Sequence, residues 1–448
     1  MKKIVTTLFL SLSIIIGCQE NNKKKEKEDT EESTPQQFKK SDNLEELGVS
    51  SKRVEEMDSL LQAFVDEKKV NAVTGFVAQH GNVLYDKAFG YKDLENKTPA
   101  STEDYYVLFS QTKAITTVAF MTLVEKGLVK VEDPVSKYFP EISDQVVTKV
   151  NDDGTYETRP VTTPMTFAHL MSHSSGLNAG LVSEIRKSEG VNDTVPTNFG
   201  EEKSDQSPTG QRSFGGDAAS RYLKDEMIEL AKYPLGFNPG SEWNYHISTN
   251  MLAYMIEVIS GEPLQKYVKE TVLNPLGMND TDWYYEPKAL DRFVKPYTIT
   301  EYGLEAGSTN FAEAAISEDQ TYAEGAIGLN GPIEDYAKFC QMLLNGGTFN
   351  NHQILKPETI KKMTSTNRLP EENAGGKGFQ FGLGFQLQNK DNKHVPAVSN
   401  TAYNWGGMLG TEYIIDPEND LIALFYINMF KRDNLYPQFL EKAYKIAE

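Results

Sequence analysis

The chain has 448 residues, of which 39% are hydrophobic and 10% aromatic. This composition is typical of globular proteins, and the length allows one large domain or two closely packed ones. The formal net charge of −19 would repel a phosphate backbone, so nucleic acid is excluded as an expected partner.

The N-terminus has a short basic start followed by an apolar run from Ile4 to Ile16. The run is shorter than the roughly 20 residues of a transmembrane helix, so residues 1–17 are expected to be a signal peptide that is removed. Its end, IIGC, resembles the lipobox of bacterial lipoproteins. That resemblance implies that Cys18 carries a lipid and tethers the protein to a membrane of the bacterial cell envelope, facing the periplasm or the cell exterior. An ordinary secretory signal is the alternative.

Polar residues of mixed charge fill the stretch 18–45, which is expected to be a flexible linker. The folded domain is therefore expected over residues 46–448. Besides Cys18 the chain contains Cys340 alone, which leaves neither an internal disulfide nor a paired-thiolate metal site. The amphipathic helical pattern around Cys340 predicts a small, buried side chain.

The first elements of the expected domain alternate helix and strand patterns. Residues 53–68 place apolar side chains on one helical face, and residues 72–91 form two β-rich runs on either side of His80, as in a hairpin. Residues 114–127 are apolar on all sides and end at a glycine, which predicts a buried helix.

The middle of the chain is mainly helical, over about residues 110–290, and contains an irregular segment at 180–217 that is long enough to be functional or mobile. Strands return at 410–429, and a helix is expected over 436–447. Strands at both ends with helices between them predict an α/β (α+β) fold. One antiparallel sheet would be flanked by helices, with an inserted helical region and the cleft between the two parts.

The sequence FSQTKAIT places Ser110 and Lys113 three positions apart at the expected start of the buried helix. Positions i and i+3 share a helical face, so the lysine can contact the serine hydroxyl and activate it as a nucleophile. The N–H of Ser110 at a helix start could also stabilise an oxyanion. A polar turn is the alternative, but Ser-x-x-Lys occurs once in the chain, and a lysine on a buried helix needs a partner or a purpose.

Competing catalytic systems have little support in the sequence. It contains no Gly-x-Ser-x-Gly elbow and no His-Glu-x-x-His motif. His169 and His173 have the i, i+4 spacing of a zinc pair, but no glutamate lies between them, so structural hydrogen bonding is favoured over a metal site. No metal and no cofactor are expected.

Four segments resemble the serine β-lactamase superfamily, which contains class C β-lactamases, D-peptidases and related carboxylesterases and transacylases. They are FSQTKAIT, MTFAHLMSHSSGL, YPLGFNPGSEWNYHISTNMLAYMIEVISG and NWGGMLGTEYIIDPENDLIALFYIN, in the family's order. The resemblance covers the chain from about residue 46 to its end and implies a β-lactamase/penicillin-binding-protein-like fold.

The resemblance also implies roles for single residues. Ser110 corresponds to the acylated nucleophile, Lys113 to the residue that activates it, and Tyr245 to the general base that later protonates the leaving group. Lys113 is expected to lower the pKa of Tyr245, because a positive charge favours the phenolate. The N–H groups of Ser110 and Met408 would form the oxyanion hole.

The third motif, Trp405-Gly406-Gly407, stands where β-lactamases have Lys-Thr-Gly, so the cation that would hold a substrate carboxylate is missing. Without this cation, binding of a carboxylate-bearing substrate would lose on the order of 1.5–3 kcal/mol of charge-assisted hydrogen bonding. The two glycines would let an edge strand approach the substrate closely. Trp405 could simply pack in the core, but its place beside them favours a pocket wall.

The second motif departs as well, because Tyr-x-Asn becomes Tyr245-His246-Ile247 and loses an amide for a peptide-like substrate. The Trp-Gly-Gly form, and a polar residue five positions after the tyrosine, here Asn250, resemble the esterase and transacylase branch. His246, Asn250 and the Trp-Gly-Gly residues are therefore expected to contact the substrate.

The expected protein is a serine hydrolase that forms an acyl-enzyme on Ser110, acting as a carboxylesterase or transacylase on small ester or acyl substrates. A D-amino-acid peptidase or weak β-lactamase is one alternative, and a non-catalytic binding domain is another. The sequence indicates neither the acyl group nor the oligomeric state.

Overall fold

The computed structural model describes residues 37–41, 43–151, 155–190, 222–317, 320–370 and 376–448. The chain divides into a unit of residues 1–34 and a unit of residues 35–448, and all described residues belong to the second. The expected signal peptide, Cys18 and most of the expected linker lie outside the described residues. In the described part, no helix is long and apolar enough to cross a membrane.

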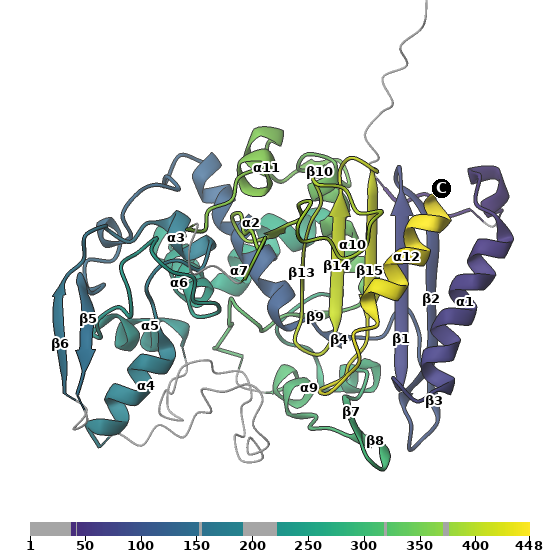
Figure 1. The fold of residues 1–448 in the computed structure, drawn as a ribbon, viewed down its shortest axis with the longest axis horizontal. Coiled ribbons are helices and arrows are strands. Elements are labelled where there is room, and N and C mark those ends of the chain that lie inside the picture. Colours follow the sequence, from purple (N-terminus) through teal and green to yellow (C-terminus); the bar gives the residue numbers. More distant parts are fainter. Residues whose placement is uncertain (1–36, 42, 152–154, 191–221, 318–319, 371–375) are drawn as a thin grey trace, which may run out of the picture. The chain divides into compact units, whose positions relative to one another are not determined.

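Within the described residues, seven strands form one antiparallel sheet in the order β12-β13-β14-β15-β1-β2-β3. Their bounds are β1 Ala72–Gln79, β2 Asn82–Asp93, β3 Thr98–Pro99, β12 Gln386–Leu387, β13 Tyr403–Gly406, β14 Thr411–Asp416 and β15 Leu421–Tyr426. The N-terminal β1 pairs with the C-terminal β15, from Thr74 opposite Tyr426 to Gln79 opposite Leu421, and Figure 1 shows the purple and yellow strands side by side. The prediction of one sheet built from both ends of the chain is confirmed.

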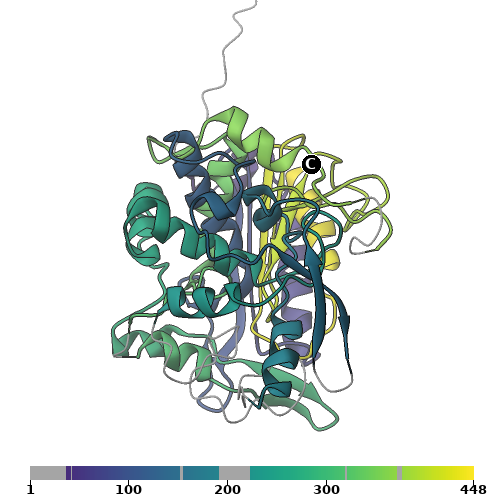
Figure 2. The ribbon, with the colours of Figure 1, turned by 90° about the vertical axis from the view of Figure 1, so that its left-hand side faces the viewer.

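The two faces of this sheet are covered by different helices (Figure 2). One face packs against α1 (Ser51–Asp66) and α12 (Tyr436–Ala447), whose buried Phe64 and Phe439 join a cluster with strand residues such as Val77. The other face packs against α2 (Thr112–Glu125) and α10 (Ile333–Leu344). Successive side chains of the central strands, such as those of β15, thus belong alternately to two hydrophobic cores, as the two-residue period of a strand requires.

The inserted helical region extends from the buried helix α2. Its further elements are α3 Phe167–Met171, α4 Ala179–Ser188, α5 Leu223–Ala231, α6 Ser248–Ser260, α7 Leu264–Val268 and α8 Asn274–Leu276, with the hairpin of β5 Gln145–Val150 and β6 Tyr156–Pro160. Between this region and β12 come β7 Tyr297–Thr300, β8 Gly303–Ala306, α9 Asn310–Ala315, β10 Thr348–Phe349, β11 His352–Gln353 and α11 Pro357–Thr364. Every residue of α2 from Thr112 to Leu123 is buried, so the predicted buried helix is confirmed.

Two expectations about irregular segments change. The segment predicted at 180–217 begins as helix α4, which Asn178 caps by accepting a hydrogen bond from the N–H of Leu181; residues 191–221 lie outside the described residues. The end of the expected linker contacts the rest of the fold. The ring centroids of Phe38 and Phe76 lie 5.2 Å apart, and Lys40 Nζ lies 2.7 Å from Glu334 Oε2.

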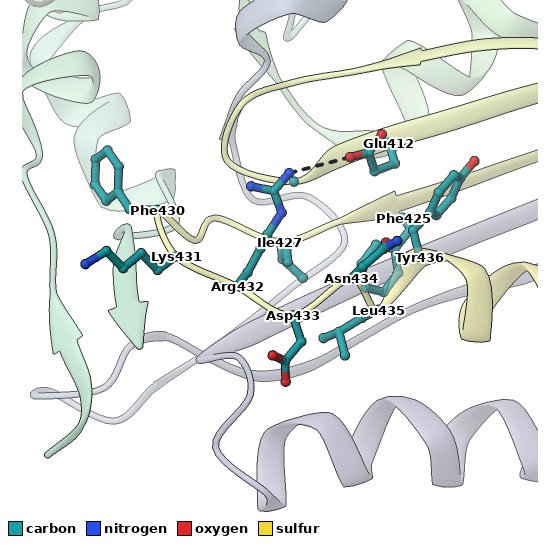
Figure 3. A pocket seen from close by; sticks show the side chains of 11 residues that line it. Glu412, Phe425, Ile427, Phe430, Lys431, Arg432, Asp433, Asn434, Leu435 and Tyr436 are labelled. Carbon is teal, nitrogen blue, oxygen red and sulfur yellow. Dashed lines mark ion pairs between the residues drawn. The ribbon is translucent and has the colours of Figure 1, made fainter. Parts of the chain in front are cut away.

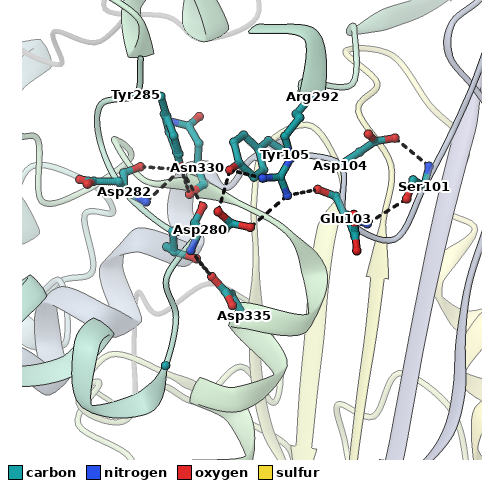
Figure 4. A network of polar contacts seen from close by, with 12 residues as sticks. Ser101, Glu103, Asp104, Tyr105, Asp280, Asp282, Tyr285, Arg292, Asn330 and Asp335 are labelled. Atoms are coloured by element: carbon teal, nitrogen blue, oxygen red, sulfur yellow. Dashed lines mark hydrogen bonds and ion pairs between the residues drawn. The ribbon is translucent and has the colours of Figure 1, made fainter. Parts of the chain in front are cut away.

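A polar network fixes the strand that leads to the expected nucleophile (Figure 4). Tyr105, directly before β4 (Tyr106–Val107), donates to Asp280 at 2.9 Å and accepts from Arg292 Nη1 at 2.6 Å. Arg292 also forms an ion pair with Asp280 at 3.0 Å. Because β4 pairs with β9 (Asn330–Gly331), the chain is held from both sides just before the nucleophile.

Candidate active site

Ser110 lies on a short 3₁₀ turn, Phe109–Gln111, that continues into α2. Phe109 has a φ of +44°, which is unfavourable for a bulky residue and persists only where packing fixes it. Its ring is buried against Phe311, with the centroids 4.7 Å apart. The turn leaves Ser110 partly exposed in a pocket of about 510 Å³.

Lys113 follows one turn later and points back at the serine, as the i, i+3 spacing predicts. Its Nζ lies 3.0 Å from Ser110 Oγ, donates to the carbonyl oxygen of Ala326 at 2.9 Å, and lies 3.3 Å from His246 Nδ1. The side chain is 2% exposed. Burial lowers the pKa of Lys113 to about 7, an effect that the charge of Glu324 only partly opposes.

Tyr245 lies beside Lys113 and comes from the loop before α6. Trp405 Nε1 donates to its hydroxyl at 2.8 Å, and Lys113 Nζ lies over its ring, 4.6 Å from the centroid. Burial raises the pKa of Tyr245 above its ordinary value, although hydrogen bonds with Ser110 and Trp405 act in the opposite direction. The expected lowering of this pKa by Lys113 is therefore wrong: the lysine contacts the ring face, and its own pKa falls instead.

Aromatic rings enclose Tyr245. The rings of His173 and Trp243 lie 4.7 and 5.7 Å from it, and Phe381 packs edge-on against Trp405 at 5.2 Å. Trp243 and Phe381 were not predicted as parts of the site. Trp243 stands two positions before the motif tyrosine and could have been noticed, whereas the region of Phe381 carries no motif.

Close contacts require glycine at the second glycine position of the third motif, Gly407. A Cβ on Gly407 would lie 2.5 Å from the carbonyl oxygen of Leu108 and 2.2 Å from Thr411 Oγ1, so only glycine lets the hairpin approach the chain beside Ser110. A Cβ on Gly406 would lie 1.9 Å from the carboxylate of Glu412.

The same pocket brings together most of the expected site. Of the described residues, it is lined by Phe109, Ser110, Tyr245, His246, Ile327, Gln386, His394, Asn404, Trp405, Gly406, Gly407, Met408 and Glu412. Ser110, Tyr245, His246, Trp405, both glycines and Met408 are thus placed at one site. Gln386, His394, Asn404 and Glu412 were not predicted as parts of the site. Asn404 and Glu412 lie in the segment of the third motif but were not singled out, and Gln386 and His394 lie outside the four resembling segments.

Asn250 does not line this pocket, contrary to expectation. It is 0% exposed on α6, where its Nδ2 donates to Glu324 at 3.0 Å and its Oδ1 accepts from the N–H of Ala326 at 2.9 Å. Because Ala326 also accepts from Lys113, Asn250 supports the segment that holds the lysine. The position five residues after Tyr245 turns into the core.

The two histidines with zinc-like spacing serve different contacts. His169 Nδ1 accepts from the N–H of Thr166 and completes the cap of α3. His173 lies against Tyr245, and burial lowers its pKa well below the ordinary value. In the described part of the chain, no group of three His, Cys, Asp or Glu side chains is arranged to hold a metal ion.

Glu412 adds an acidic side chain to the lining of the pocket. It is 25% exposed, and burial raises its pKa to about 7 against the opposing effect of Arg432. His394 Nε2 accepts from the side-chain amide Nδ2 of Asn404 at 2.9 Å. The lining of the pocket thus combines polar groups with the aromatic wall of Trp405.

The chain is similar to known proteins over most of its length. The model of the Beta-lactamase family matches residues 57–440. Protein Rv1367c of Mycobacterium tuberculosis is 28% identical over 368 residues, which cover 80% of this chain and 85% of its own length. Esterase EstB of Burkholderia gladioli is 26% identical over 390 residues, covering 83% and 89%.

Among solved structures, EstCE1, a hydrolase with promiscuous acyltransferase activity, has a TM-score of 0.67 at 23% identity and covers 88% of this chain and 98% of its own. That likeness supports the predicted β-lactamase/penicillin-binding-protein-like fold, an antiparallel sheet flanked by helices. The family match spans most of the chain, so the chain belongs to the Beta-lactamase family and is a serine hydrolase.

Proposed function

We propose that the protein is a carboxylesterase or transacylase that forms an acyl-enzyme on Ser110. The observation that carries this proposal is the 3.0 Å contact between Lys113 Nζ and Ser110 Oγ, together with a Lys113 pKa lowered to about 7. Near neutral pH a large share of the lysine is unprotonated, so its lone pair can accept the serine proton.

In the first half-reaction, Ser110 Oγ attacks the ester carbonyl carbon while Lys113 Nζ takes the hydroxyl proton. The N–H groups of Ser110 and Met408 would hold the oxyanion. Collapse of this intermediate expels the alkoxide, which takes the proton from Lys113 and leaves as an alcohol. In the second half-reaction, water or another alcohol attacks the acyl-enzyme, and the products are a carboxylic acid or a new ester.

Tyr245 has a different role from the one that the motif implied. A raised pKa keeps its hydroxyl protonated near neutral pH, so in this mechanism it is not a phenolate base. Its hydroxyl accepts from Trp405 and can donate to the entering or leaving oxygen. Tyr245 would thus position the alcohol, while the proton itself moves between Ser110 and Lys113.

The charge of the pocket favours neutral esters over carboxylate-bearing substrates. Of the described residues that line it, none is a lysine or arginine, and Glu412 is acidic. Trp405 occupies the place where the motif of β-lactamases has lysine. A β-lactam or a peptide C-terminus would bring a carboxylate to the apolar wall of Trp405 and to Glu412, where none of the lining residues is a lysine or arginine that could pair with it.

Two assays on the purified protein test this proposal. A fluorophosphonate probe, followed by peptide mass spectrometry, should modify Ser110 in the wild type and leave Ser110→Ala unmodified. Turnover of a p-nitrophenyl ester should exceed that of a chromogenic cephalosporin. Absence of labelling would favour a non-catalytic binding domain, and faster cephalosporin turnover would favour the β-lactamase or D-amino-acid peptidase alternative.

We also propose, from the N-terminal sequence, that Cys18 is lipidated and anchors the protein to a membrane of the cell envelope. Cells expressing the full chain would be fed an alkyne fatty acid. The wild type should incorporate it and fractionate with membranes, whereas Cys18→Ser should not. Cys340→Ser is the matched control, because Cys340 is buried. Equal labelling of wild type and Cys18→Ser would overturn this assignment.

A further inference from the structure

The turn between β13 and β14 carries Met408, and a separate chain segment supports it from behind. Ile427 donates its backbone N–H to the carbonyl oxygen of Gly410 at 3.2 Å, and Met429 donates to that of Leu409 at 2.9 Å. The turn that would supply the second oxyanion donor is therefore docked onto the end of β15 and the loop that follows it.

Arg432, from the same loop, adds a side-chain contact to this turn. Its Nη1 donates to the carbonyl oxygen of Met408 at 2.5 Å. A Cβ on Gly410 would lie 2.9 Å from Arg432 Nε, and Gly410 has a φ of +97°, so the guanidinium fits closely along a turn that requires glycine. Holding the carbonyl of Met408 fixes the planar peptide unit that this carbonyl shares with the N–H of Leu409. It therefore limits rotation about the backbone of Met408, whose own N–H is attached to the same Cα.

Glu412 approaches the guanidinium from the sheet, as Figure 3 shows. Its Oε1 lies 3.6 Å from Arg432 Nη2. It stands directly opposite Gly406 in the β13–β14 register, and its carboxylate occupies the space where a Gly406 side chain would lie. Arg432 thus joins two places at the active-site pocket, the carboxylate of Glu412 and the carbonyl of Met408.

We propose that Arg432 is a positioning residue for the oxyanion-stabilising turn and that Glu412 orients its guanidinium. The inference rests on the proposed function, because charge develops beside Met408 only during acyl transfer. Arg432 lines a hollow of about 430 Å³ behind the turn and is not among the residues that line the pocket of Ser110. A loosened turn weakens transition-state stabilisation more than substrate binding, so kcat should fall while KM stays nearly constant.

The test compares Arg432→Met, Arg432→Lys and Glu412→Gln with Lys431→Met, a charge-matched control in the same loop. Two quantities are measured on the full chain: kcat and KM for p-nitrophenyl acetate, and the inhibition constant of phenylboronic acid. The boronic acid forms a tetrahedral adduct on Ser110 that places an oxygen where the oxyanion would form. Arg432→Met should lower kcat and weaken the boronate by the same factor, about 10–100-fold, with KM within about twofold.

Arg432→Lys should recover part of this loss, because its ammonium can still donate to the Met408 carbonyl. Glu412→Gln should give a smaller loss, since the amide still accepts from the guanidinium, and Lys431→Met should behave as the wild type. If Arg432→Met does not fold, the positioning role is judged from Arg432→Lys and Glu412→Gln, which must each lower kcat and boronate affinity in parallel.

Three negative results are distinguishable. If the wild type reacts with a fluorophosphonate at Ser110 but Arg432→Met retains normal kcat and boronate affinity, the positioning role is overturned and the proposed function stands. If the wild type neither reacts with the probe nor hydrolyses esters, the proposed function itself fails. Equal losses in kcat, ester affinity and melting temperature, without recovery in Arg432→Lys, would indicate a general structural role and also overturn the inference.

Discussion

The two sides of the β13–β14 hairpin are built from opposite kinds of interaction. On the side of Ser110, Trp405 packs among aromatic rings and donates to Tyr245. On the other side, the ion pair of Glu412 and Arg432 lies behind the turn. One side carries the titrating groups of the reaction, and the other carries an ion pair whose side chains are partly exposed.

This difference shows that burial and charge perform separate tasks in one small structure. Removing water from Lys113 lowers its pKa to about 7, which an ion pair beside it would prevent. Fixing the peptide of Met408 needs a directed donor, which the aromatic side cannot supply and Arg432 does. Substitutions on the aromatic side should therefore change ionisation and chemistry, and those on the charged side should change geometry.

The largest effect is expected from Ser110→Ala, which removes the nucleophile from the aromatic side. Ester turnover should fall about 10³-fold or more, while the melting temperature stays unchanged because the hydroxyl is partly exposed. Ser59→Ala, on the exposed face of α1, serves as the control. Turnover close to that of the wild type, in a folded Ser110→Ala protein, would place the nucleophile elsewhere.

Lys113→Met should separate activity from stability. Loss of the base should lower kcat about 10²–10⁴-fold. In the wild type, burial lowers the pKa of Lys113 from 10.5 to about 7, which reduces the free energy of unfolding. Between these two pH values the unfolded protein binds more protons than the folded protein. The cost is full at and below pH about 7 and disappears as the pH rises through about 10.5.

At pH 7, the free energy of unfolding of Lys113→Met should therefore exceed that of the wild type by on the order of 1–3 kcal/mol, after allowing for the lost hydrogen bond to Ala326. Urea unfolding at pH 7 and at pH 10 checks this, and the gain should shrink at the higher pH. Lys126→Met, at the exposed end of the same helix, should gain nothing. A destabilised Lys113→Met protein at pH 7 would argue that the lysine is not held unprotonated by burial.

Trp405→Phe should have an intermediate effect, because it keeps an aromatic wall and removes one donor. Loss of the 2.8 Å hydrogen bond to the Tyr245 hydroxyl should reduce kcat about 3–10-fold. Steady-state kinetics with a neutral ester measure this. A change confined to KM would mean that Trp405 acts only as a pocket wall and does not position Tyr245.

The smallest effect on turnover is expected from Asn250→Ala. Asn250 holds the segment of Ala326 and Glu324 and lies outside the pocket, so KM should stay constant. The free energy of unfolding should fall by about 1–3 kcal/mol, because buried partners lose their hydrogen bonds. A large rise in KM without loss of stability would restore the sequence-based view that Asn250 contacts the substrate.

Elements that depend on neighbouring residues in the sequence, such as turns and amphipathic helices, were predicted correctly. The turn at His80-Gly81 was predictable because two β-rich runs flank it. In the structure both residues adopt the positive φ that a tight hairpin requires. The contact of Lys113 with Ser110 follows from helical periodicity. The C-terminal helix over 436–447 follows from its amphipathic pattern and forms as expected.

Features that depend on the meeting of distant segments could not be predicted. The pKa of Tyr245 rises because burial, to which rings from two other parts of the chain contribute, disfavours its phenolate, whereas the motif alone suggested only the nearby lysine. Glu412 lies within the third resembling segment and Arg432 just beyond it. Their contacts with each other and with Met408 exist only once β14, β15 and the following loop are assembled. Asn250 was misplaced because spacing along the chain does not specify which side of α6 faces the pocket.

The central claim is that Lys113, unprotonated near neutral pH, is the base for Ser110. The most direct test is the pH dependence of the rate at which a fluorophosphonate modifies Ser110. The rate should rise with pH around a midpoint near the Lys113 pKa of about 7, the rise should persist in Glu412→Gln, and Lys113→Met should lack it. A midpoint near the ordinary lysine value of 10.5, or an unchanged profile in Lys113→Met, would contradict the claim.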